Sequence, residues 1–256
     1  MILPWHRPEL ERLAHEGTAL PHAILIRGPE GIGKVEFARS LAQLLLCEGN
    51  RTETAACGHC TACEWVRQAA HPDFRVIETE SVEDSEDEGQ GGRKKTGVRI
   101  SVDQIRALTE FVNLSSHRSR GKVILIHPAE AMNANAANAL LKSLEEPPPA
   151  TYFLLVSHRW HQLPATIKSR CRQVLLAPPE QEAAQAWLSE QGTDQPELAL
   201  AHAGGAPVAA ARYEPEYWEQ RAAFFAAITQ PDFDPLRTAE KLRDLPLRDL
   251  VRWLQQ

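Results

Sequence analysis

The sequence lacks a long apolar segment, a leader-like N-terminus and an excess of positive charge. No run of 18 apolar residues occurs, so no transmembrane helix is expected. The apolar stretch at the N-terminus is short and is interrupted by proline and charge, which argues against a signal peptide. A net charge of −6 argues against a protein that grips DNA alone through an overall basic surface. These absences favour a cytoplasmic protein with no membrane partner.

Cysteine is also scarce, and its distribution is uneven. The chain of 256 residues has five cysteines, of which four fall within residues 47–63. In a cytosolic chain such a cluster indicates a metal site rather than disulfides. The hydrophobic content of 43 % is ordinary for globular proteins, so one or two domains with a sizeable core are expected.

One stretch, residues 22–39, organises the rest of the chain. Apolar residues at 23–26 predict a buried strand, a glycine-rich turn follows, and a helix is expected from Lys34 through Leu46. In that order the spacing G-x-x-x-x-G-K predicts a phosphate-binding loop. Loop N–H groups, the helix N-terminus and the lysine ammonium would converge on an anion. The candidate binding residues are Gly28, Gly31, Gly33 and Lys34.

The loop lacks one residue that an ATPase site needs. In active phosphate loops a Ser or Thr hydroxyl after the lysine ligates Mg²⁺, and this sequence has Val35 there. We therefore expect weak nucleotide binding or none. A tight strand-to-helix turn that is retained for packing is the alternative.

Strands and helices alternate up to a boundary at Pro178-Pro179, which predicts an α/β fold with a parallel sheet. Residues 78–97 carry blocks of charge and are expected to form a surface loop, with an acidic protein-binding loop as the alternative. Beyond the boundary everything is predicted to be helical. We expect strands at 23–26, 74–77, 122–126 and 152–156, and helices at 4–17, 34–46, 61–70, 102–112, 132–146, 180–191, 196–203, 207–212, 216–229 and 235–255.

The cysteine cluster is the most specific chemical signal. Cys57-x₂-Cys60-x₂-Cys63, with Cys47 upstream, offers four thiolates, which suit tetrahedral Zn²⁺ in a closed structural site. An iron–sulfur cluster is the main rival, but a ferredoxin run needs a fourth cysteine where this chain has an arginine. Free thiols, or His59 in place of the upstream cysteine, are further alternatives.

Several long motifs together resemble one family. They are the phosphate loop followed by a four-cysteine insert, His71-Pro72-Asp73, AANALLKSLEEPP at 136–148 and LPATIKSRC at 163–171. The combination resembles the clamp-loader AAA+ proteins of bacterial replication, and in particular the delta-prime subunits of DNA polymerase III. The similar stretches cover most of residues 4–178.

The resemblance implies a domain plan. A P-loop AAA+ domain would occupy residues 1–178, with the zinc module at 47–63, and a small helical lid would occupy 179–212. Residues 213–256 would begin a helical collar, which in that family joins five subunits in a ring. The chain ends about one helix pair into this region, so we expect a truncated or partial collar.

The family also indicates which catalytic parts are missing. Motor subunits have Asp-Glu after the strand that corresponds to 123–126, where this chain has His127-Pro128. Their lid offers an arginine to the γ-phosphate, where this chain has Pro207. With Val35, three parts of phosphoryl transfer are absent, so we expect no ATP hydrolysis. Ser157, which stands where motors place a phosphate sensor, is then expected to be ordinary.

In the family a Ser-Arg-Cys motif projects an arginine into the ATP site of the neighbouring subunit. The matching residues are Ser169-Arg170-Cys171, so the resemblance implies that Arg170 is an arginine finger in trans. By itself His127 is most simply a solvated strand-end residue. Lys142 and Glu145, three apart on one helix, are expected to form an intrahelical ion pair.

The resulting hypothesis is a non-catalytic stator of the sliding-clamp loader, an accessory subunit of the DNA-directed DNA polymerase III holoenzyme. Its expected partners are the gamma/tau motor subunits and the delta wrench subunit, with the sliding clamp and primer–template DNA reached through the complex. The alternative is an active AAA+ ATPase of the clamp-loader or helicase type, against which Val35 and His127-Pro128 argue. A zinc-dependent nucleic-acid-binding module would rest only on Trp65 and Arg67.

Overall fold

The computed structural model divides the chain into two compact units, Met1–Ala183 and Ala184–Gln256, which are described separately below. No helix in the described part of the chain is long and apolar enough to cross a membrane. The three-part division at residues 178 and 212 stays a prediction. The structure describes residues 2–16, 20–49, 52, 55–83, 96–114, 116, 121–229, 234–241, 243, 245 and 247–254.

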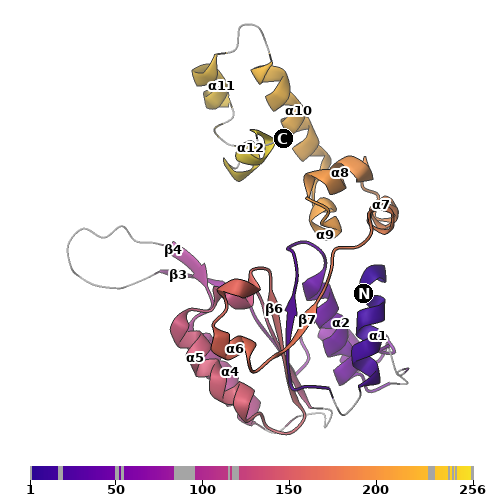
Figure 1. Ribbon diagram of the computed structural model, residues 1–256, viewed down its shortest axis with the longest axis vertical. Coiled ribbons are helices and arrows are strands. Elements are labelled where there is room, and N and C mark those ends of the chain that lie inside the picture. The colour runs from indigo at the N-terminus through magenta and orange to yellow at the C-terminus, as the bar shows by residue number, and fades with distance from the viewer. Residues whose placement is uncertain are drawn as a thin grey trace, which may run out of the picture. The chain divides into compact units, whose positions relative to one another are not determined.

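The first unit is built on a five-stranded parallel sheet with the strand order β2-β5-β6-β1-β7 (Figure 1). The inner strands read as continuous apolar runs because side chains on both of their faces are buried. The four predicted strands are confirmed, whereas β7 was not predicted. The strands are β1 (Ala23–Arg27), β2 (Phe74–Ile77), β5 (Lys122–Ile126), β6 (Thr151–Ser157) and β7 (Arg172–Leu175).

Helices cover both faces of this sheet (Figure 1). On one face Leu25, Ile124 and Phe153 form a core with apolar residues of α4 (Val102–Asn113) and α5 (Ala134–Glu145). The alternate strand residues, such as Ile24 and Leu125, are fully buried on the other face. There α2 (Lys34–Leu46) contacts the sheet and also α1 (Arg7–His15) and α3 (Thr61–Arg67).

The carboxyl ends of the parallel strands meet at one edge, where such sheets place their ligands. Here β1 continues into the glycine-rich loop, β5 into the short helix η3 (Ala129–Ala131), and β6 into η4 (Trp160–Gln162). The register places Arg27 beside both Ser157 and Leu175. The loop, the end of β6 and the end of β7 are therefore neighbours.

Two segments of the first unit differ from the prediction. The expected surface loop at 78–97 is strand at both ends, because β3 (Glu80–Glu83) and β4 (Thr96–Arg99) pair antiparallel. Residues 84–95 lie outside the described residues. Within LPATIKSRC the chain forms α6 (Ala165–Lys168) before it enters β7.

The second unit is helical, as predicted. Its core joins α7 (Gln181–Glu190), α8 (Pro196–His202) and α9 (Pro207–Ala210) through small and apolar side chains, including the fully buried Leu188 and Ala199. The indole of Trp253 in α12 (Leu247–Leu254) donates to the Tyr217 hydroxyl of α10 (Pro215–Ile228) at 2.8 Å.

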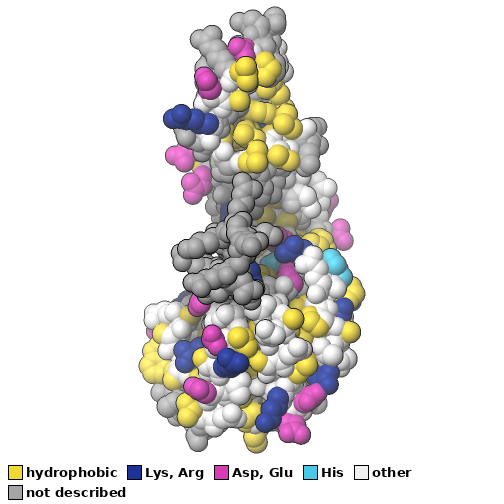
Figure 2. Space-filling model, turned by 90° about the vertical axis from the view of Figure 1, so that its left-hand side faces the viewer, with side chains coloured by type: hydrophobic (Ala, Val, Ile, Leu, Met, Phe, Trp, Pro, Cys, Tyr) yellow, Lys and Arg dark blue, Asp and Glu magenta, His cyan; other side chains and the backbone are white. Residues whose placement is uncertain are grey.

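The predicted single helix at 235–255 is wrong, since α11 (Pro235–Lys241) and α12 are separate helices. The sequence has Pro246 just before α12, and proline in a helix interior removes a hydrogen bond and clashes with the preceding turn. These two helices carry exposed Leu236, Leu247 and Leu254, and hydrophobic side chains gather on this unit in Figure 2.

Candidate functional site

Backbone conformation requires glycine at three positions of the phosphate loop, and close packing adds to this at two of them. Gly28, Gly31 and Gly33 all have positive φ, a region that disfavours other residues. A Cβ at Gly33 would lie 2.0 Å from Cδ1 of Leu3, and one at Gly28 would lie 2.3 Å from the Leu176 carbonyl oxygen. The loop therefore has the predicted strand–turn–helix setting. The segments that contain Leu3 and Leu176 pack closely against it.

Lys34 is folded back onto this loop. Its side chain is buried, and its ammonium donates a hydrogen bond to the carbonyl oxygen of Pro29 within the loop. Burial lowers the pKa of Lys34 to about 8, although the carboxylates of Glu130 and Glu30 oppose the shift. The lysine is thus satisfied by the chain itself and does not project into solvent.

Glu130, which the sequence analysis did not single out, joins Lys34 at this edge of the sheet. It lies in η3, and its Oε1 accepts the backbone N–H groups of His158 and Arg159, each at 3.0 Å. Burial acts to raise the pKa of Glu130, but the nearby Ser157 hydroxyl and the hydrogen bonds from these N–H groups outweigh it and lower the pKa. A carboxylate therefore lies in the field of the loop lysine.

The structure describes all three positions at which the sequence departs from the pattern of motor subunits. Val35 is half-buried in the first turn of α2, and Pro207 is buried at the first position of α9. His127 at the end of β5 donates to Glu78 Oε1 at 2.9 Å with its side chain only 18 % exposed. This partly exposed imidazole is thus paired with a carboxylate, a contact that the sequence did not predict. Ser157 is completely buried at the end of β6.

The four clustered cysteines converge on one point, as predicted. Their sulfur atoms all lie within 4.8 Å of one another, with Cys47 and Cys60 at 4.0 Å and Cys57 and Cys63 at 3.9 Å. Neighbouring sulfurs in a tetrahedral zinc centre are ~3.8 Å apart, given Zn–S bonds of about 2.3 Å. A disulfide would need about 2.05 Å, so the arrangement fits a shared metal ion.

Local hydrogen bonds hold these sulfurs in place. Cys60 caps α3 by accepting the N–H of Cys63, and Cys57 accepts the N–H of Cys60. Burial would raise the pKa of Cys60, but the N–H groups of Cys63 and Glu48 outweigh it and lower the pKa to about 6. A Cβ at Gly49 would lie 2.6 Å from the Cys57 sulfur, which explains the glycine there.

The alternatives that used neighbouring residues lose their support. The His59 imidazole is exposed and donates to the Cys57 carbonyl at 2.7 Å, and it is not part of the four-sulfur group. Arg67 donates to the Gly58 carbonyl at 2.6 Å, and the Trp65 ring packs edge-on against His71. The two residues that a nucleic-acid-binding module would use thus both have partners within the chain.

Arg170 lies between α6 and β7, with 32 % of its side chain exposed. It pairs with Glu145 at the end of α5, so the predicted Lys142–Glu145 pair is replaced by a contact between segments 25 residues apart. Its other described partners are Thr166 and Ser169 of its own turn. None of these described contacts is with the phosphate loop of the same chain.

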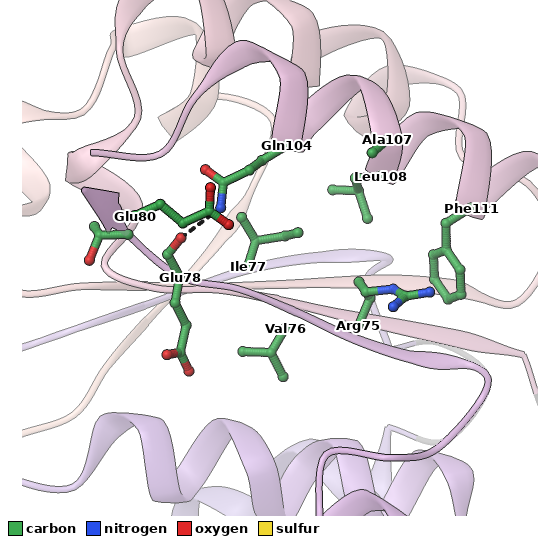
Figure 3. A pocket seen from close by; sticks show the side chains of 10 residues that line it. Arg75, Val76, Ile77, Glu78, Glu80, Gln104, Ala107, Leu108 and Phe111 are labelled. Atoms are coloured by element: carbon green, nitrogen blue, oxygen red, sulfur yellow. Dashed lines mark hydrogen bonds between the residues drawn. The ribbon is translucent and has the colours of Figure 1, made fainter. Parts of the chain in front are cut away.

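A separate pocket of about 620 Å³ lies between β2 and α4 (Figure 3). The Gln104 amide donates to the Glu78 carbonyl across it at 2.9 Å, and the Arg75 guanidinium lies 4.9 Å from the Phe111 ring centroid. No residue of the phosphate loop or of the cysteine cluster lines it. It is a groove beside an edge strand rather than part of the predicted site.

Comparison with known proteins shows the family to which this chain belongs. The family described as "DNA polymerase III, delta subunit" matches residues 8–180. The DNA polymerase III subunit delta′ of Pseudomonas aeruginosa is 38 % identical over 98 % of this chain and 74 % of its own length. The chain belongs to the delta′ family of DNA polymerase III subunits. The tau subunit of Escherichia coli is 37 % identical, over 59 % of this chain and 21 % of its own length.

The delta′ assignment agrees with the fold. A DNA polymerase III gamma-subunit-related protein of Thermotoga maritima superposes with a TM-score of 0.50 at 20 % identity, over 98 % of this chain and 77 % of that one. The predicted AAA+ architecture, with a parallel sheet, a four-cysteine insert and a helical C-terminal part, is thereby confirmed. The relatives of this chain are named as delta′ subunits of DNA polymerase III.

Proposed function

We propose that this chain is a non-hydrolysing stator of the bacterial sliding-clamp loader that supplies Arg170 to the ATP site of a neighbouring motor subunit. Membership of the delta′ family supports a role in the replication clamp loader. The proposed neighbours are a gamma/tau motor subunit and the delta subunit. The sliding clamp and the primer–template DNA would be reached through the assembled complex.

The absence of hydrolysis is inferred from the loop. Phosphoryl transfer needs a hydroxyl and a carboxylate to hold Mg²⁺, a group to position water, and cations on the γ-phosphate. The corresponding positions hold Val35, His127-Pro128 and Pro207, and Lys34 is bonded to its own loop. ATP binding is therefore expected to be weak or absent.

One observation carries the proposal for Arg170. Its guanidinium is partly exposed, and its described contacts are all with α5, α6 and the turn after α6. None of these contacts is with the phosphate loop of the same chain. The permanent charge and fixed donors of the guanidinium suit the phosphate oxygens of a nucleotide bound to another subunit.

The cysteine cluster is proposed to hold a structural Zn²⁺ through Cys47, Cys57, Cys60 and Cys63. With four sulfur ligands no coordination position is left open, so the ion would stabilise the turn between α2 and α3 and take no part in chemistry. The ion would act as a cross-link within the first unit.

The arginine finger is tested in the assembled loader. Arg170→Ala should leave the chain folded and the complex assembled but lower steady-state ATPase, because a finger is worth ~10³–10⁵ in rate at the one site it serves. Arg106→Ala is the matched control, since Arg106 is also a surface arginine paired with a carboxylate, Asp103, at 3.0 Å. An ATPase rate equal to that of the control complex would contradict the proposal.

A further inference from the structure

The Arg170 side chain is folded back onto its own subunit. Its Nε donates to Glu145 Oε1 at 2.6 Å, and its Nη2 is paired with the same oxygen. Its Nη1 donates to the Thr166 carbonyl at 2.9 Å and lies 3.4 Å from the Ser169 hydroxyl. All three guanidinium nitrogens therefore have partners within the chain, and Thr166 lies four residues back along α6.

Glu145 occupies one of the two edges of the guanidinium that can bind a phosphate. An arginine binds a carboxylate or a phosphate through a pair of neighbouring N–H donors, and the Nε–Nη2 edge is one of its two such pairs. In this structure that edge faces Glu145. A neighbour's phosphate and the Glu145 carboxylate would thus compete for one set of donors.

The position of Glu145 in its helix supports a dedicated pairing. Glu145 is the last residue of α5, where the helix dipole disfavours a negative charge. The adjacent Glu146 is the helix cap and is also exposed, which makes it a natural comparison. The Arg170 charge offsets the unfavourable field at Glu145.

The ion pair between Arg170 and Glu145 is weak enough to break readily. The two side chains are 32 % and 47 % exposed, and ion pairs in contact with water contribute little to stability. A triphosphate carries more charge than one carboxylate, so it can displace Glu145 when it is brought near. Such a contact releases the arginine readily, and while it is formed the Nε and Nη2 donors are occupied.

We propose that Glu145 is a positioning residue that holds Arg170 in a retracted state and so limits how often the arginine reaches the neighbouring nucleotide. This inference rests on the proposed function of Arg170. It predicts that removing the carboxylate charge raises the basal ATPase of the assembled loader, measured without clamp or DNA, by roughly twofold to fivefold.

The test uses loaders assembled with the full chain as wild type, Glu145→Gln, Arg170→Ala or the double variant. Glu146→Gln is the matched control, because it removes the neighbouring charge from the same helix end. Thermal melting of each variant chain checks the fold. Glu145→Gln should raise the rate, Glu146→Gln should not, and the increase should vanish when Arg170 is also replaced.

The outcomes separate the two proposals. If Arg170→Ala lowers the rate but Glu145→Gln leaves it unchanged or lowers it, the retracted state is wrong and the arginine finger stands. An increase that persists in the double variant also contradicts the retracted state. If Arg170→Ala has no effect, the proposed function itself fails.

Discussion

At the scale of single residues, His6 connects the N-terminal segment to the phosphate loop. Its ring is buried and packs edge-on against Trp5 and Phe37, and a Cβ at Gly33 would lie 3.5 Å from it. Burial, together with the positive charge of Lys34, lowers the pKa of His6 to about 4. His6 therefore remains neutral in the folded protein at mildly acidic pH.

This depressed pKa makes a prediction about stability. In the unfolded chain a histidine titrates near pH 6.5, so on acidification the unfolded state binds a proton that the folded state does not. The stability that neutral His6 contributes is present above about pH 6.5 and is lost as the pH falls towards about 4. We expect His6→Phe to flatten the fall in the free energy of unfolding across this interval.

The measurement is urea unfolding of wild type and His6→Phe at several pH values between 7 and 4. Neither ring nitrogen of His6 has a hydrogen-bond partner in the described structure, so phenylalanine removes the titration without breaking a bond. Parallel stability curves for the two proteins over that interval would show that His6 is not the titrating group.

Some residues of the site could be predicted from the sequence and others could not. The glycines and Lys34 form a contiguous motif, and the cysteines have a short, regular spacing. Glu130 gave no such signal, because it follows a strand by four residues and no periodicity fixes its direction. The Glu145–Arg170 pair joins two segments that only the fold brings together.

At the scale of elements, the cysteine module between α2 and α3 makes the clearest prediction. One Zn²⁺ should be found per chain, and Cys60→Ser should abolish it, because the site then has three sulfurs. Metal analysis of the purified, dialysed protein measures this. Cys171→Ala is the control, since Cys171 is buried in the main core and is not part of the cluster. Iron in place of zinc, or no metal, would overturn the assignment.

The elements that the sequence predicts well have strong periodicity. The strands β1, β5 and β6 have continuous apolar centres, and α4 opens with a capping box formed by Ser101 and Gln104. The missed strand β7 buries only Val174 of its four residues, so it has no apolar run to reveal it. The hairpin of β3 and β4 is held by backbone pairing in a charged segment.

At the scale of the whole molecule, we interpret the chain as one subunit of an assembly. Under the proposed function, Val35 and His127-Pro128 stand in place of groups that would hydrolyse ATP, and Arg170, which would serve a neighbour's phosphate, lies outside the phosphate loop. On the face in Figure 2 basic and acidic side chains of the first unit are interspersed. With a net charge of −6, DNA contact is expected only together with neighbouring subunits.

The most direct test of this account uses the isolated chain. Titration calorimetry with ATP, with and without Mg²⁺, would be combined with a phosphate-release assay and an active motor subunit as the positive control. The account predicts no phosphate release, and ATP binding that is absent or insensitive to Mg²⁺. Mg²⁺-dependent binding with turnover would contradict it, because Val35 and His127-Pro128 would then not have disabled the site.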